Sequence, residues 1–398
     1  MAVLSAATKN RLKNISALLI SAFVCLILLE LLFRAFDFPP PHYSGWKSNN
    51  KKEELNQLGF RGQIINYSDN DFVILLLGDS QVQAGVCSFS MMPEKRLEHY
   101  LQQIPGITKK IKVFTVGTGG YGQDQEFLML KEYYKKFRAD MVVLWLTPHN
   151  DIRDNVFPSH WPTNGAPKPT YWIKNDTLMG PSEQPGDIVH EERLKLYALL
   201  NRTLIKLGVR KKPTSMRRDD QWDAFLPKPY QPLQNYSGLV KTDWQEAWDK
   251  NIDVDGYVKD DNLENDKNRF NEYLTPTGDR TRYGLDLTRR LLDSIRITVE
   301  KHKGNFSIFF TQIPVHNNDK CLQDGVYSLN GKNYRISNAQ YQENLDFVTK
   351  GFTFFPIPVA VKDWRVGYNN AHLNEKTNDI VMRDLADTIK YLVLHKMK

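Results

Sequence analysis

The stretch FVILLLGDS, residues 72–80, places an uninterrupted apolar run directly before a glycine, an aspartate and a serine. Apolar runs without alternation are typical of parallel strands that are buried on both faces of a sheet. Similar runs recur at residues 111–116, 141–146 and 306–313. Segments with helical spacing separate the first three runs, at residues 93–103 and 125–138. This alternation predicts an α/β fold with a doubly wound, mostly parallel sheet.

Composition places the chain among ordinary globular proteins. It has 398 residues, of which 41% are hydrophobic and 25% charged, enough for one large decorated domain or two smaller ones. The net charge of +7 arises from 53 basic and 46 acidic residues that are spread along the chain. Because no arginine-rich run accompanies this charge, we expect a weakly basic surface and no nucleic-acid partner. The 3 cysteines include no CxxC pair, so we expect no structural zinc site.

An apolar segment near the N-terminus, residues 15–36, is long enough to cross a bilayer. About nineteen helical residues span roughly 28 Å, close to the hydrocarbon thickness. Basic residues precede the segment and an acidic, proline-rich stretch follows it, which predicts a cytoplasmic N-terminus and an exported body. The lack of a small-residue cleavage site favours an uncleaved anchor over a signal peptide. Glu30, near the far end, is expected to snorkel to the headgroups.

These features divide the chain into three parts. Residues 1–36 are expected to form a cytoplasmic tail and transmembrane anchor, residues 37–70 a linker, and residues 71–398 the folded domain. Within that domain, residues 155–290 break the alternation of strand and helix, so we interpret them as a large insertion. Two elements are expected inside it, a hairpin at residues 170–179 and a helix at residues 190–207.

Polar residues follow three of the predicted strands at their carboxyl ends, where α/β sheets bind ligands. Ser80 follows the first strand, Gly120 lies in a glycine-rich turn after the second, and Asn150 follows the third. A serine hydroxyl becomes a nucleophile when a base accepts its proton, and the resulting oxyanion needs hydrogen-bond donors. His372, just before a last predicted helix at residues 377–395, is the candidate base. Each of these residues alone also fits an ordinary structural role, as a helix cap, a turn residue or a surface residue.

Taken in order, these four blocks resemble the SGNH or GDSL hydrolase family, over roughly residues 70–155 and 300–395. The resemblance implies a three-layer sandwich in which Ser80 is the nucleophile and His372 the base. It implies an oxyanion hole made by Ser80, Gly120 and Asn150. It implies neither a cofactor nor a metal.

The chain departs from this family at the partner of the histidine. The family usually places an aspartate two or three residues before it, whereas this chain has Asn369 and Asn370. An amide can accept the same hydrogen bond but supplies no charge to stabilise the imidazolium. Either Ser80 and His372 act as a dyad, with Asp363 or a backbone carbonyl orienting the ring, or hydrolysis is weak.

The resemblance and the anchor together support one hypothesis and leave two others open. The first is a membrane-anchored serine esterase or acyltransferase that acts on O-acyl groups, O-acetyl above all, of extracytoplasmic glycans in the periplasm or outside the cell. The second, motivated by the asparagine pair, is a catalytically weak or inactive component of cell-envelope polysaccharide biosynthesis. The third is a lipase that acts on membrane lipids.

Other segments of the sequence resemble binding sites or a disulfide pair of a different kind. Residues 251–262 begin like a calcium loop, but Asn262 stands where a bidentate glutamate is required, which favours a polar turn. His149, Asp151 and Asp154 are metal-ligand types, yet neighbouring positions point in different directions, which favours structural roles. If the body is exported, Cys87 and Cys321 lie in an oxidising compartment and are able to pair. The tryptophans of the insertion fit sugar stacking or, more commonly, a small satellite core.

Overall fold

The structure is a computed structural model. It describes residues 6–36, 38, 54–156, 159–160, 166–167, 170–181, 194–210, 271–275, 277, 279–312, 326–329, 332–361, 363–367 and 370–397. The chain forms two compact units, one made of residues 1–46 and 189–214 and the other of residues 47–188 and 215–398. Each unit is described by itself.

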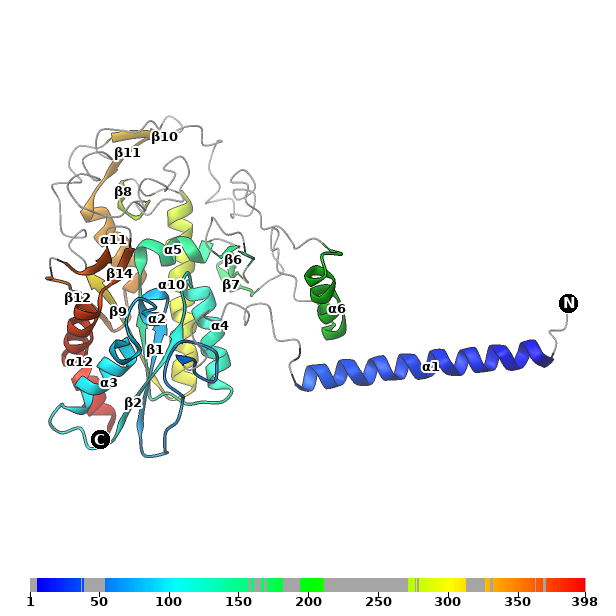
Figure 1. The fold of residues 1–398 in the computed structure, drawn as a ribbon. Helices are drawn as coiled ribbons and strands as arrows, with labels where there is room; N and C mark the ends of the chain where they lie inside the picture. The colour runs from blue at the N-terminus through cyan, green and yellow to red at the C-terminus, as the bar shows by residue number, and fades with distance from the viewer. Residues whose placement is uncertain are drawn as a thin grey trace. The chain divides into compact units, whose positions relative to one another are not determined.

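Five parallel strands form the central sheet of the larger unit, in the order β12, β9, β3, β1, β2 (Figure 1). They are β1 Phe72–Gly78, β2 Ile111–Gly117, β3 Met141–Trp145, β9 Asn305–Gln312 and β12 Phe354–Pro358. The first four confirm the strands predicted from their apolar runs. β12 was not predicted, because Pro356 and Pro358 argue against a central strand; it is an edge strand, where proline is tolerated.

Helices cover both faces of this sheet and complete a three-layer α/β sandwich (Figure 1). α3 Pro93–Gln102 and α12 Glu375–Met397 pack together on one face. The other face carries α4 Gln123–Tyr134, α5 Pro148–Val156, α10 Asp279–Lys301 and α11 Asn338–Thr349. α10 begins inside the segment interpreted as an insertion, and its buried residues, including Leu291, Ile295 and Val299, recur at helical spacing.

The sheet is buried on both faces, as its sequence predicts. All seven residues of β1 are buried, and the strand lies between β3 and β2. β1 and β2 end in register, with Gly78 opposite Gly117. A Cβ atom on Gly117 would lie 2.1 Å from the Gly78 carbonyl oxygen, so only glycine allows the two strand ends to approach this closely.

The remaining elements are short. Around residue 80 lie α2 Ser80–Gln83 and the 3₁₀ turn η3 Phe89–Met91. Elsewhere lie η6 Asn271–Tyr273, β4 Ser159–His160, β5 Ala166–Pro167, β6 Trp172–Lys174, β7 Thr177–Met179, β8 Leu274–Thr275, β10 Val326–Leu329, β11 Lys332–Ile336, β13 Arg365–Gly367 and β14 Asn370–Leu373. β6 and β7 confirm the predicted hairpin. Their turn residues Asn175 and Asp176 have positive φ angles of 47° and 63°, as a tight hairpin turn requires.

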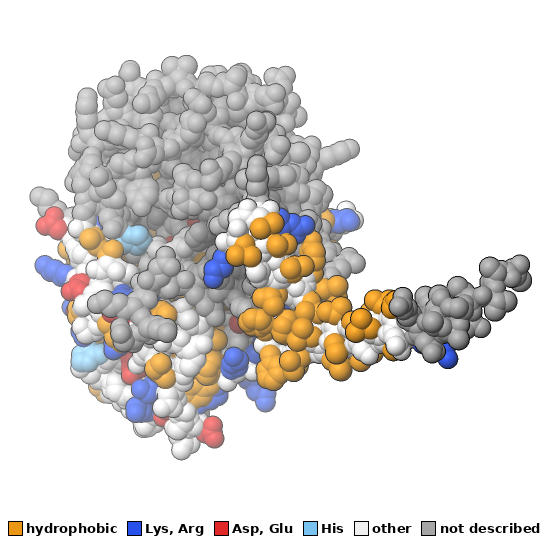
Figure 2. All heavy atoms as spheres, turned by 45° about the vertical axis from the view of Figure 1, so that its right-hand side comes forward, with side chains coloured by type: hydrophobic (Ala, Val, Ile, Leu, Met, Phe, Trp, Pro, Cys, Tyr) orange, Lys and Arg blue, Asp and Glu red, His pale blue; other side chains and the backbone are white. Residues whose placement is uncertain are grey.

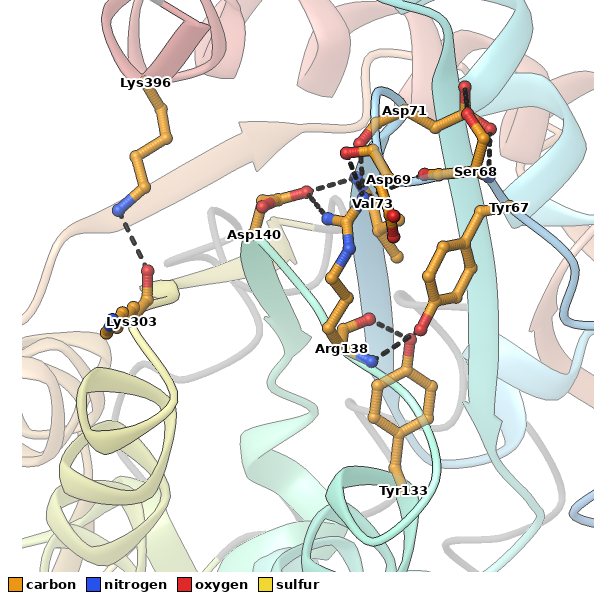
Figure 3. A network of polar contacts seen from close by, with 10 residues as sticks. All are labelled: Tyr67, Ser68, Asp69, Asp71, Val73, Tyr133, Arg138, Asp140, Lys303 and Lys396. Carbon is orange, nitrogen blue, oxygen red and sulfur yellow. Dashed lines mark hydrogen bonds and ion pairs between the residues drawn. The ribbon is translucent and has the colours of Figure 1, made fainter.

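A polar network closes the amino ends of the strands (Figure 3). The Arg138 guanidinium donates hydrogen bonds to the carbonyls of Ser68, Asp69 and Asp71 and pairs with Asp140. Asp140 in turn accepts the backbone N–H of Val73 at 2.8 Å. These contacts tie the start of β1 to the start of β3 and leave the carboxyl ends as the edge that can carry a site.

The smaller unit contains α1 Ala6–Ala35 and α6 Lys195–Lys206. Within Lys13–Ala35, an 18-residue window has a mean hydropathy of 2.7, and no residue of that window is buried. Apolar side chains cover this part of the helix (Figure 2). Among the described residues this is the one helix long and apolar enough to cross a membrane. Its length and composition fit both a membrane anchor and a signal sequence. α6 matches the helix predicted within the insertion.

Glu94, in the first turn of α3, gives the stability of the larger unit a pH dependence. Burial raises the pKa of Glu94 to about 7 from 4.5, against opposing hydrogen bonds from Gln63 and Thr115. The folded protein therefore keeps a proton that the unfolded chain releases between pH 4.5 and pH 7, so stability falls as the pH rises through that range.

We predict that Glu94→Gln removes this loss. The variant should be more stable than the wild type above pH 7 by about 3 kcal/mol, because its side chain has no charge to bury. Below pH 4.5 the two proteins should have similar free energies of unfolding, measured in urea. An equal difference at both pH values would contradict this explanation.

Candidate active site

The candidate nucleophile Ser80 begins α2, a single helical turn that directly follows β1. Asp79 caps this turn, because its Oδ1 atom accepts the backbone N–H of Gln81 at 2.8 Å. Val82, one turn along, is fully buried against β1 and would clash with any side chain at Gly78. The end of the strand and the buried Val82 thus leave Ser80 half-buried at the carboxyl edge of the sheet.

Asn150 lies in α5, just after β3, and points back to the first strand end. Its Nδ2 atom donates a hydrogen bond to Asp79 Oδ2 at 3.0 Å, and both side chains are buried. An amide nitrogen carries two hydrogens, so Asn150 is able to donate to a ligand as well as to Asp79. The structure therefore brings the Gly-Asp-Ser and Asn-Asp segments together, as their positions after neighbouring strands predict.

The glycine-rich turn after β2 lies on the other side of α2. The backbone N–H of Gly119 donates to Gln83 Oε1 at 2.9 Å, and a Cβ atom on Gly119 would lie 3.8 Å from Ser80 Cβ. Gly120 has a φ angle of 75°, a left-handed conformation that side chains disfavour. The turn thus exposes backbone beside Ser80, where an approaching substrate needs room.

His372 lies in β14, a short strand that contacts α2. The backbone N–H of Leu373 makes a long contact of 3.4 Å with Gln81 Oε1, and the Leu373 carbonyl lies against Cys87 Sγ. Asn374 then caps α12, because its Oδ1 atom accepts the N–H of Thr377 at 2.9 Å. The strand that carries the half-buried His372 therefore contacts the helix that carries Ser80. Direct bonding between the two side chains stays a prediction.

Three residues were expected to orient the His372 ring, and the structure describes two of them. Asn369 lies outside the described residues, and the backbone of Asn370 begins β14 opposite Gly367. Asp363 is exposed, and its carbonyl accepts a hydrogen bond from Asn374 Nδ2.

Buried carboxyl groups lie beneath the site, a feature that sequence reasoning missed. Burial raises the pKa of Asp79 to about 6, and the nearby Asp154 adds to the shift while the hydrogen bond from Asn150 opposes it. Burial and then the charges of Asp79 and Asp124 raise the pKa of Glu126 well above its usual range. Burial and then the charges of Glu126 and Asp79 do the same for the pKa of Asp151. Burial and neighbouring negative charge therefore favour the protonated form of all three carboxyl groups.

Amides at the start of α4 connect this cluster to the surrounding helices. Gln123 Nε2 donates to Asp151 at 2.7 Å, and Asn155 Nδ2 donates to Gln123 at 2.7 Å and to Thr288 of α10 at 2.8 Å. Asp151 also accepts the backbone N–H of Thr147 at 2.6 Å. Residues 123–126 form a polar run that resembles a solvated helix face, so hydropathy alone gave no signal of their burial.

Arg61 is a second residue that sequence reasoning missed. It is 4% exposed, although it lies in the segment expected to be a linker, which packs into the larger unit from residue 54 onward. Its guanidinium donates to the carbonyls of Ala84 and Cys87 just after α2 and pairs with Glu54. Contacts with backbone carbonyls leave no sequence signature at the partner residues. Arg61 thus fixes the chain that leaves α2.

Among the residues that the structure describes, no group of three or more His, Cys, Asp or Glu side chains is arranged to hold a metal ion. Asp151 and Asp154 are buried in the network beneath the site. Residues 251–262 and Cys321 lie outside the described part of the chain, whereas Cys87 is buried.

No protein-family model and no curated protein matches this chain. Two similar solved structures are esterases. The psychrotrophic esterase EstA from a Pseudoalteromonas species, inhibited by monoethylphosphonate, has 9% identity and a TM-score of 0.33, and the match covers 81% of this chain and 99% of that one. The acetyl xylan esterase Est2A from the rumen bacterium Butyrivibrio proteoclasticus has 10% identity and a TM-score of 0.32, over 83% of this chain and 66% of that one. At TM-scores this low, neither likeness defines the activity of this chain.

The glycine turn yields a matched pair of substitutions. Gly120→Ala should lower the free energy of unfolding by about 1 kcal/mol, because an alanine is strained at a φ angle of 75°. Gly119→Ala should leave stability unchanged or slightly higher, since its Cβ atom would make ordinary contacts at 3.5 Å and beyond. Thermal unfolding of both variants tests this, and equal destabilisation would show that the turn geometry is wrong.

Arg61→Met should destabilise the larger unit by roughly 3 kcal/mol, because it leaves buried carbonyls after α2 without their donor. Arg383→Met is the control, since Arg383 is exposed and pairs with its sequence neighbour Asp384, so its loss should leave the free energy of unfolding nearly unchanged. Urea unfolding measures both. Similar costs for the two variants would contradict the role of Arg61 in holding α2.

Proposed function

We propose that this chain is a membrane-anchored serine esterase or acyltransferase of the SGNH type. The observation that carries the proposal is the convergence of Ser80, the turn with Gly120, and Asn150 at the ends of β1, β2 and β3. The hydrogen bonds from Asn150 to Asp79 and from Gly119 to Gln83 support this arrangement. In the proposal, the nucleophile Ser80 and donors that follow two neighbouring strands act on a single carbonyl group.

In the proposed reaction, the Ser80 Oγ atom attacks the ester carbonyl while His372 accepts the hydroxyl proton. The carbonyl oxygen becomes an oxyanion that accepts hydrogen bonds from the backbone N–H groups of Ser80 and Gly120 and from Asn150 Nδ2. The tetrahedral intermediate collapses, the C–O bond of the ester breaks, and His372 returns the proton to the departing alcohol. Water or an acceptor hydroxyl then attacks the acyl-serine and regenerates Ser80.

The Asp79 carboxylate has a positioning role in this scheme. It accepts one hydrogen of the Asn150 amide and the N–H of Gln81, so it orients a proposed oxyanion donor and starts the helix of the nucleophile. Because Asn369 and Asn370 stand where the family usually has an aspartate, the proposal is a Ser80–His372 dyad, with Asp363 or a backbone carbonyl orienting the ring. A dyad provides less stabilisation of the imidazolium than a triad does, so modest turnover is expected.

We propose an O-acetylated extracytoplasmic glycan as the substrate, because the family resemblance and the apolar helix α1 together suit an exported, anchored enzyme. The basic residues before the apolar segment of α1 support a cytoplasmic N-terminus, which leaves the larger unit outside the cytosol. No metal or cofactor takes part in the proposed mechanism.

The decisive test combines an active-site label with ester hydrolysis by the full chain in detergent. A fluorophosphonate should label the wild type and not Ser80→Ala, and acetyl ester hydrolysis should fall at least about 10³-fold in that variant. Ser90→Ala, which removes a nearby surface hydroxyl, should behave as the wild type does. Labelling that survives in Ser80→Ala would overturn the assignment of the nucleophile.

A substrate series separates the proposed activity from its alternatives. Release of acetate from an acetylated glycan, with falling rates on longer acyl chains, supports the glycan esterase. Faster hydrolysis of long-chain esters would favour a lipase instead. A folded protein that neither reacts with the label nor hydrolyses any ester would favour the noncatalytic component that the asparagine pair suggests.

A further inference from the structure

Glu30 interrupts the apolar part of α1, and the smaller unit gives it specific partners. Its carboxylate accepts the backbone N–H groups of Lys195 at 3.1 Å and Leu196 at 2.9 Å, and Arg34 pairs with it at 2.7 Å. Lys195 and Leu196 are the first residues of α6. Instead of simply snorkelling, Glu30 therefore binds the first turn of a second helix.

The contact with Glu30 fixes the position along α1 at which α6 begins. α1 ends at Ala35, so Glu30 lies about 8 Å before the end of the helix along its axis. If Lys13–Ala35 spans a bilayer, that position falls near the boundary between the acyl chains and the headgroups. The first turn of α6 contacts α1 at Glu30, and α6 lies at a steep angle to α1 (Figure 1), so its length extends along this boundary.

The exposed face of α6 is apolar. Tyr197, Leu200, Leu204 and Leu207 recur at helical spacing, and Leu200 and Leu207 are 54% and 69% exposed. Ala198, which belongs to another face, is buried within the unit. Apolar side chains gather both on α1 and on α6 beside it (Figure 2). A stripe that continues the surface of a membrane helix meets lipid more readily than water.

The charge around this stripe suits a lipid surface. The sequence from residue 193 to residue 218 contains Lys and Arg repeatedly and no Asp or Glu. Lys206 is exposed at the end of α6, and the Arg210 guanidinium reaches back to the Tyr197 hydroxyl at 3.1 Å. Apolar residues on one face and basic residues beside it are the pattern of helices that lie in the membrane interface.

We infer that α6 is an interfacial helix that lies on the outer surface of the bilayer, with anionic lipid headgroups as its partner. Leu200, Leu204 and Leu207 enter the acyl-chain boundary, while Lys206 and Arg210 contact lipid phosphates. The chain thus meets the membrane twice, at α1 and again at residues 195–207. This inference rests on the proposed anchor and not on the proposed esterase activity.

The test uses the full chain in liposomes of phosphatidylcholine and phosphatidylglycerol. In a background with Cys25→Ser, Cys87→Ala and Cys321→Ser, a single cysteine from Leu207→Cys carries an environment-sensitive fluorophore. The quencher is carried by lipids near the top of the acyl chain. It should reduce the fluorescence of the probe at Leu207→Cys at least about twofold more than that of the same probe at Lys206→Cys, the neighbouring basic position. Leu200→Cys should behave as Leu207→Cys does.

Restoring Cys25 alone provides the control for the anchor, because this residue is exposed in the middle of α1. Suppose that the Cys25 probe is quenched while the probes at positions 207 and 206 are quenched equally and weakly. This result would overturn the inference about α6 and leave the anchor intact. An apolar emission at Leu207 without lipid quenching would overturn it too, since the stripe would then pack on protein. An unquenched Cys25 probe would remove both the anchor and this inference, whereas the ester assays would be unaffected.

Discussion

The hydrogen bond from the Asn150 amide to the Asp79 carboxylate is the contact on which the arrangement of the candidate site depends. It joins the end of β3 to the end of β1 between buried groups, where leaving either partner unpaired costs about 1–3 kcal/mol. Because Asp79 also accepts the N–H of Gln81, one carboxylate fixes both the direction of Asn150 and the first turn of α2. Ser80 lies between these two contacts.

α2 connects the other parts of the site, although it is a single turn. Gln83 holds the glycine turn through the Gly119 N–H, Gln81 contacts the strand that carries His372, and Arg61 binds the carbonyls that follow the turn. Beneath it, burial and then the charges of neighbouring carboxylates, Asp79 among them, raise the pKa values of Glu126 and Asp151. A protonated carboxyl group can donate as well as accept a hydrogen bond, so the raised pKa values reduce the negative charge that the cluster places beneath the site.

Much of the fold could be predicted because local patterns carry it. The apolar runs of β1, β2, β3 and β9 are typical of buried parallel strands, and glycines or polar residues mark where those strands end. β12 was missed because its prolines hide an edge strand, and α10 because the polar segment before it was taken as insertion, although its apolar stripe was a usable signal. Arg61 and the buried residues 123–126 depend on partners far away in the sequence, which no local pattern reveals. Arg61 binds the carbonyls of Ala84 and Cys87, and Gln123 accepts a hydrogen bond from Asn155.

The central claim is that Ser80, His372, Gly120 and Asn150 share one reacting carbonyl. The most direct measurement is a crystal structure of the chain after reaction with a phosphonate ester, whose tetrahedral phosphorus stands in for the acyl intermediate. We expect phosphorus bonded to Ser80 Oγ, one phosphoryl oxygen within hydrogen-bond distance of Gly120 N and Asn150 Nδ2, and the His372 ring beside the leaving-group oxygen. An adduct on another residue, or a His372 ring turned away from Ser80, would contradict this account.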